Sequence, residues 1–135
     1  MVGITLLDGM KALEAGFQRA RELGIIVAVS VVDARGDLIV SARMDGSLWW
    51  WTETSRAKAF ASVAYGGMKS GDLMDRSNNP VAQALVHMHQ GRIAPQQGAV
   101  PLFRGTVLFG AIGAAGGSGA EDEDVSAMAV QSISL

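Results

Sequence analysis

Apolar and polar residues follow two different periods along this chain, and together they predict helices and strands in a definite order. Near the start, Leu13, Phe17 and Ala20 recur at the spacing of one helix face, whereas residues 25–32 form an almost unbroken apolar run that is typical of a buried strand. The expected elements are a helix over 5–24, strands over 25–32 and 37–44, helices over 52–66 and 79–91, strands over 99–103 and 106–112, and a helix over 118–133. A further short strand near Ile93 would complete an antiparallel sheet of five strands covered by helices, which is an α+β fold.

Side-chain caps indicate where three of these helices begin. Ser118 with Glu121 has the spacing of a capping box, in which two side chains satisfy free backbone N–H groups reciprocally. Thr5 can cap the first helix, with Asp8 three residues further on. Thr52 is expected to cap the second helix.

Four glycines within residues 113–119 predict a loop that leads into the last helix. Glycine lacks a Cβ atom, so a ligand can approach the backbone of Gly113, Gly116 and Gly117 closely. Ser118 then opens a helix whose free N–H groups can bind an anion. Neither a P-loop nor a Gly-x-Gly-x-x-Gly pattern occurs, so nucleotide binding is not indicated. The four acidic residues at 121–124 oppose an anion at the same place, so the pattern leaves the charge of the ligand open.

Composition excludes several classes of function. The chain has 135 residues, which predicts a single domain over 1–135, and its net charge of −2 provides no basic surface for nucleic acid. The absence of cysteine excludes disulfides and thiolate metal sites. The first residues lack the basic stretch of a signal peptide, and no apolar run is long enough to span a bilayer. We therefore expect a cytoplasmic protein with no membrane partner.

Segments along nearly the whole chain resemble one known family in residue type and order. The matching positions are Val31-Val32-Asp33, Gly36-Asp37-Leu38, Arg43-Met44-Asp45-Gly46, Ala57-Lys58-Ala59, Gly98-Ala99-Val100-Pro101-Leu102, Gly105, Gly110-Ala111-Ile112-Gly113, Gly116-Gly117 and Asp122. This pattern resembles the GlcG/HbpS-like family, which includes the C-terminal domain of PduO-type proteins. The resemblance implies a profilin-like fold, with a five-stranded antiparallel sheet between helix layers (an α/β/α sandwich). It also implies homo-oligomers and, for some members, haem binding or a link to cobalamin and glycolate metabolism.

Three charged residues supply candidate chemistry near the glycine-rich segment. Lys58 lies in an alanine-rich helix, and the resemblance retains a lysine there, so we expect it to hold a carboxylate or enolate oxygen. Arg43 can clamp a carboxylate with two hydrogen bonds. Asp122 is retained in the resemblance and can orient a base or bind a cation. The alternative is that such residues form a solvated surface, or complement the dipole of the last helix.

Histidine and tryptophan extend the list of candidates. His87 and His89 point about 200° apart on a helix and cannot chelate one metal ion as an i, i+4 pair can, so we predict no metal site. His89 lies nearer to the segment that leads into Gly98, so it is the expected proton donor or acceptor. The three adjacent tryptophans at 49–51 cannot all face one way. We therefore place Trp50 on a pocket wall and expect another to anchor a subunit interface.

These observations support hypotheses from different classes. The first is an oligomeric protein that binds a small ligand, either haem or another flat or carboxylate-bearing molecule, in a pocket between the glycine loop, the second helix and the tryptophan segment. The second is a cofactor-free enzyme of isomerase, lyase or hydratase type that acts on a small carboxylate or carbonyl compound. In that enzyme Lys58 and Arg43 would stabilise an oxyanion, and His89 or Asp122 would move a proton. The third is an interaction subunit in which the tryptophans serve assembly alone.

Overall fold

The computed structural model describes residues 3–133, and its helices and strands follow the order predicted from sequence. The elements are α1 (Leu6–Leu23), β1 (Ala28–Asp33), β2 (Leu38–Arg43), α2 (Trp51–Ala64), the 3₁₀ helix η1 (Ser70–Arg76), α3 (Pro80–Met88), β3 (Ala99–Arg104), β4 (Val107–Ala115) and α4 (Gly119–Gln131). None of the helices within residues 3–133 has both the length and the apolar character needed to cross a membrane.

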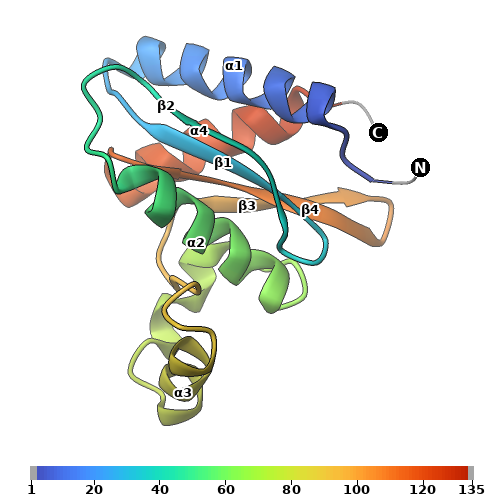
Figure 1. The fold of residues 1–135 in the computed structure, drawn as a ribbon, viewed down its shortest axis with the longest axis vertical. Helices are drawn as coiled ribbons and strands as arrows, with labels where there is room; N and C mark the ends of the chain where they lie inside the picture. Colours follow the sequence, from blue (N-terminus) through green and yellow to red (C-terminus); the bar gives the residue numbers. More distant parts are fainter. Residues whose placement is uncertain (1–2, 134–135) are drawn as a thin grey trace.

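The strands form one antiparallel sheet with helices on both of its faces. The strand order is β2-β1-β4-β3, so the two hairpins meet where β1 pairs with β4. Figure 1 shows α1 and α4 on one face of the sheet and α2 on the other, with α3 lying beyond α2. The α+β arrangement with helices enclosing an antiparallel sheet is therefore confirmed.

The expected fifth strand does not form within residues 3–133, where the sheet has four strands. Ile93, which was to lie in that strand, is buried against Ala61 of α2 and Leu73 of η1. The next residue, Ala94, donates its N–H to the carbonyl of Ala57 at 3.1 Å. The prediction of five strands was wrong because this short apolar segment packs against a helix instead of pairing with the sheet.

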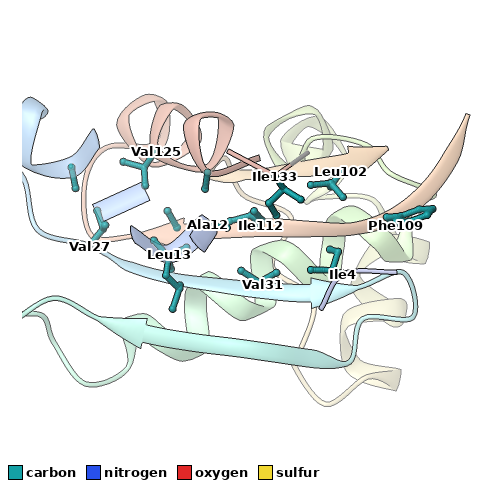
Figure 2. Close-up of a cluster of buried hydrophobic side chains, with 14 residues drawn as sticks. Ile4, Ala12, Leu13, Val27, Val31, Leu102, Phe109, Ile112, Val125 and Ile133 are labelled. Atoms are coloured by element: carbon teal, nitrogen blue, oxygen red, sulfur yellow. The ribbon is translucent and has the colours of Figure 1, made fainter. Parts of the chain in front are cut away.

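The main hydrophobic core lies between the sheet and the α1–α4 layer. Figure 2 shows Val31 of β1 and Ile112 of β4 together with Leu13 of α1 and Val125 of α4. These side chains come from positions that alternate along the strands and recur along the helices, as the periodicity requires. The opposite face of the sheet carries small residues and receives α2.

The glycine-rich segment begins as a strand and not as a loop. β4 continues to Ala115, so Gly113 pairs with Ser30 on one side and with Ala99 on the other. A Cβ atom at Gly113 would collide with the backbone oxygen of Ser55 in α2. Glycine is therefore needed at this position for close packing of α2 on β4, and the loop shortens to residues 116–118.

The predicted cap at Thr5 and the predicted capping box at Ser118 both form, and Thr5 makes a full capping box with Asp8. The predicted cap of α2 was wrong, because Trp50 occupies the N-cap position and its side chain makes no capping hydrogen bond. Thr52 lies inside the helix, where its hydroxyl donates to the carbonyl of Trp49 at 3.2 Å.

Candidate functional site

A buried ion pair joins the two helices that pack on opposite faces of the sheet. The Lys58 ammonium of α2 donates to Asp122 Oδ2 of α4 at 3.1 Å and to the carbonyl oxygen of Ala114 at 3.0 Å. Lys58 is 5% exposed and Asp122 is 2% exposed. Paired and hydrogen-bonded charges of this kind are the form in which ionised groups are tolerated in a protein interior.

The turn before α4 positions Asp122. Its Oδ1 accepts the N–H of Gly117 at 2.8 Å, while the capping box of Ser118 and Glu121 fixes the first turn of the helix. Burial raises the pKa of the Asp122 carboxyl, whereas the Lys58 ammonium and the Gly117 N–H oppose that rise. The carboxyl is thus a group whose protonation depends on what else contacts Lys58.

Gly98 leaves the space that the lysine side chain occupies. A Cβ atom at Gly98 would lie 2.8 Å from Lys58 Nζ and 2.8 Å from the carbonyl oxygen of Ala114. Its φ of +147° also belongs to the region that side chains rarely adopt. Ser126 of α4 holds this backbone in place by donating its hydroxyl to the Gly98 carbonyl at 2.6 Å.

A cavity of about 750 Å³ opens beside the ion pair. Its walls come from α2, from the η1–α3 segment, from the chain just before β3 and from the start of α4. The lining residues are Lys58, Met74, Ser77, Ala82, Gln83, Val86, His87, Pro95, Gln96, Gln97, Gly117, Gly119 and Asp122. A concave site of this size, with apolar walls and a few polar groups, is typical of small-molecule binding.

The structure brings three of the predicted site residues together, namely Lys58, Asp122 and Gly117. His89 lies elsewhere, with its ring tilted against Phe60 at a centroid distance of 5.9 Å. His87 takes its place on the cavity wall. The two histidines face different directions, as the sequence predicts. His89 was the expected proton donor or acceptor, but His87 is the histidine that lines this cavity.

The other predicted glycine-segment residues serve the backbone beside the cavity. Gly116 packs against Trp51, whose ring would lie 2.8 Å from a Cβ atom at this position. The Ser118 hydroxyl accepts the N–H of Glu121 at 3.2 Å and so caps α4. Gly113 packs under α2. Gly113, Gly116 and Ser118 do not line this cavity, and their roles in ligand binding stay predictions.

Arg43 and Trp50 also lie away from the cavity. Arg43 ends the edge strand β2 and donates to the carbonyl of Ser47 at 2.7 Å. Trp50 is 43% exposed at the start of α2, and its ring meets that of Trp51 edge-on at 6.4 Å. The pocket expected beside the tryptophan segment is instead completed by the η1–α3 segment.

Sequence reasoning did not include His87, Met74 or Gln97 in the site. On α3, Val81 and Met88 are exposed, whereas Leu85 packs against the cluster of Ala61, Leu73 and Ile93. Because α3 is apolar on most sides, its periodicity does not single out one face. The i, i+4 spacing could have indicated the site. It puts Ala82 above Val86 and Gln83 above His87 on neighbouring stripes of α3, so that a histidine lies beside an apolar stripe. Among residues 3–133 there is no group of three or more histidine and acidic side chains placed to hold a metal ion.

Known proteins resemble the chain over almost its full length. Corrinoid adenosyltransferase PduO of Salmonella typhimurium is 31% identical over 137 residues, which cover 99% of this chain but only 40% of that relative. The crystal structure of a PduOC:heme complex superposes with a TM-score of 0.86 at 30% identity and covers 98% of this chain and 96% of the other. A double mutant of Streptomyces reticuli HbpS gives a TM-score of 0.84 at 26% identity, with 100% and 90% covered.

The family comparison agrees with these pairwise likenesses. A family model described as haem degrading protein HbpS-like matches residues 4–131. The resemblance inferred from the sequence motifs is thereby confirmed. The chain belongs to the HbpS-like family.

Proposed function

We propose that this protein binds a small ligand, with haem as the first candidate, in the cavity between Lys58, the start of α4 and the η1–α3 segment. The observation that carries the proposal is the cavity itself, which joins a buried ion pair at one side to a histidine and apolar residues at the other. The volume of about 750 Å³ is within the usual range for cofactor and ligand sites.

The lining residues fit haem by their chemistry. His87 and Met74 are side chains of the types that ligate haem iron, and Ala82 and Val86 provide an apolar wall. Lys58 supplies an ammonium hydrogen-bond donor for an acidic edge group. When bound, haem would supply the redox chemistry of its iron. The protein's own part would be to hold the ring, exclude water and orient its charged edge.

A relative supports this choice of ligand. The crystal structure of the PduOC:heme complex has this fold and is 30% identical to this chain in sequence. The adenosyltransferase activity in the name of the PduO relatives belongs to proteins of which this chain spans 40% or less, so we do not extend it to this protein.

A haemin titration with matched histidine variants tests the proposal. Wild-type protein should bind haemin saturably and shift its Soret band. His87→Ala should weaken binding and alter the spectrum, whereas His89→Ala should leave both unchanged because His89 packs on Phe60 outside the cavity. Saturation absent in the wild type, or equal spectra for the two variants, would contradict the proposed site.

We also propose that the protein self-associates. Trp49 and Trp50 are 68% and 43% exposed, and Leu48 beside them is exposed as well. Clustered aromatic residues on a surface favour burial in an interface. Native mass spectrometry would count the subunits, and a monomer at micromolar concentration would remove this part of the proposal.

A cofactor-free enzyme is the second candidate, favoured by the Lys58–Asp122 pair at the cavity. Lys58 could stabilise an enolate oxygen of a small carbonyl acid while Asp122 moves the proton. With pyruvate in D₂O, NMR should then show deuterium entering the methyl group with wild-type protein and not with Lys58→Met. A wild-type rate equal to the buffer rate, across a panel of such acids, would count against this candidate.

A further inference from the structure

We propose that Lys58 and the first turn of α4 hold a carboxylate of the ligand, and that Asp122 takes up one proton from solvent when that carboxylate binds. The inference rests on the proposed ligand-binding function and deepens it, because it names the group that the cavity recognises and the condition that controls binding. The carboxylate can belong to a haem propionate or to a small organic acid.

Lys58 has a hydrogen-bond donor to spare. An ammonium group carries three N–H donors, and two of them are directed to Ala114 and Asp122. Among residues 3–133 no acceptor is present for the third, although Lys58 lines the cavity and is 5% exposed. Because Lys58 lines the cavity, an acceptor atom of a ligand placed there can take the third donor.

The start of α4 offers a second donor to the same cavity. Gly119 is the first residue of α4 and lines the cavity, and its N–H has no partner inside the helix. The Ser118 and Gly117 N–H groups are already bound, to Glu121 at 2.9 Å and to Asp122 at 2.8 Å. The ammonium of α2 and the first backbone N–H of α4 line the same cavity, and two such donors suit the two oxygens of a carboxylate.

Charge balance then requires a change at Asp122. In the free protein Lys58 and Asp122 neutralise one another, so a ligand carboxylate brings an uncompensated negative charge into a buried site. Two carboxylates that share one ammonium cannot both remain ionised without a large electrostatic cost. Burial already raises the pKa of Asp122, and the neighbouring Glu121 raises it further. Asp122 is therefore the group that becomes neutral.

His87 is the other titratable group on the cavity wall and needs a separate control. It lies on α3 and lines the same cavity, where an imidazole can also donate a hydrogen bond to an anion. A His87→Asn variant removes the imidazole and leaves the Lys58–Asp122 pair intact.

The balance of the step is simple. The ligand carboxylate forms hydrogen bonds to Lys58 and Gly119, Asp122 gains one proton from solvent, and no covalent bond changes. Linkage then requires that Kd rises with pH between the pKa of Asp122 in the free protein and its pKa in the complex, by up to about tenfold per pH unit. A ligand without a charge should show no such dependence.

The experiment uses matched charged and neutral probes. Benzoate against benzamide, and haemin against haemin dimethyl ester, are titrated by calorimetry and absorbance from about pH 5 to about pH 8. Titration in two buffers of different ionisation enthalpy counts the protons taken up. For wild type and His87→Asn we expect near one proton per benzoate and none per benzamide. If haemin binds and benzoate does not, the carboxylate that the site recognises is a haem propionate.

Asp122→Asn provides the decisive variant, since its amide oxygen can still accept the Gly117 N–H. It should bind benzoate or haemin without proton uptake and with a Kd that no longer changes with pH. A wild type that binds these acids with no pH dependence, or an Asp122→Asn variant that keeps the wild-type dependence, would overturn the inference and leave the proposed function standing. If wild type binds none of the four probes, both are overturned.

Discussion

Removing Lys58 tests whether the ion pair is as deeply desolvated as the structure indicates. In Lys58→Met the apolar stem of the side chain remains, but Asp122 loses its ammonium partner. Asp122 is only 2% exposed, so water cannot replace that partner. Breaking a buried pair in this way typically costs about 3–5 kcal/mol, because the remaining charge is uncompensated. We therefore expect the free energy of unfolding at neutral pH to fall by roughly this amount.

The loss should depend on pH in a direction that the structure fixes. Burial raises the pKa of Asp122, and the variant lacks the ammonium that opposes this rise. A group whose folded pKa lies above its unfolded value contributes its full stability below the unfolded pKa, and that contribution is lost as pH rises through the folded pKa. The destabilisation should thus be smallest near about pH 4 and grow by up to about 1.4 kcal/mol per pH unit above it.

Urea unfolding monitored by tryptophan fluorescence measures the effect, at pH values near both ends of this range. Adding Asp122→Asn to Lys58→Met should recover most of the lost stability at high pH and remove the pH dependence, because no buried charge remains. Lys69→Met is the matched control. Its ammonium is about half exposed and lies 4.0 Å from Glu123, so its loss should cost less than about 0.5 kcal/mol. Equal losses at low and high pH for Lys58→Met, or a double variant no more stable than the single one, would refute the reasoning.

Three further substitutions test other parts of the structure. Gly113→Ala should lower stability by about 3 kcal/mol or more, the upper part of the range for overpacking, since the new Cβ meets the α2 backbone; thermal unfolding by circular dichroism measures it. Ser118→Ala removes the capping hydrogen bond to Glu121 and should cost about 1 kcal/mol in the same assay. Arg19 donates to Asp124 at 3.1 and 2.9 Å and holds the pKa of that carboxyl below its ordinary value. That stability is present above the unfolded pKa and is lost as pH falls through the folded one, so Arg19→Met should lower stability slightly at pH 7 and by less as the pH becomes acidic, measured by urea unfolding.

The order of elements could be predicted because each has its own local signal. The capping boxes at Thr5 and Ser118 mark helix starts regardless of what the helices later contact. Residues 25–32 carry the aliphatic run of a strand that is buried on both faces, and this strand indeed lies inside the sheet. The family motifs indicated Lys58 and Asp122 as residues of one candidate site, although no periodicity in the sequence could show that the two side chains are in contact.

What the sequence could not provide depends on contacts between distant segments. The sequence around Ile93 is typical of a strand, but Ile93 is buried against α2 and η1. Both elements lie well before it in the sequence, so this contact cannot be predicted without knowing the fold. The choice of His89 over His87 followed from distance along the chain to Gly98. In the folded chain His87 lies on α3 and lines the cavity, whereas His89 follows the end of α3 and packs against Phe60, and both placements are set by how α3 packs.

The glycine-rich segment shows most clearly how fold and site depend on one another. The glycines of residues 113–119 suggest a ligand loop from sequence alone, yet Gly113 lies inside β4. Gly98, outside this segment, comes just before β3. The missing side chain at Gly113 lets α2 pack on the sheet, and the missing side chain at Gly98 leaves room for Lys58 Nζ to reach Ala114 and Asp122. These two glycines therefore act as spacers for one lysine. The chemistry of the cavity follows from that lysine and its partner, which is why we expect substitutions at either charged residue to alter binding more than substitutions in the turn itself.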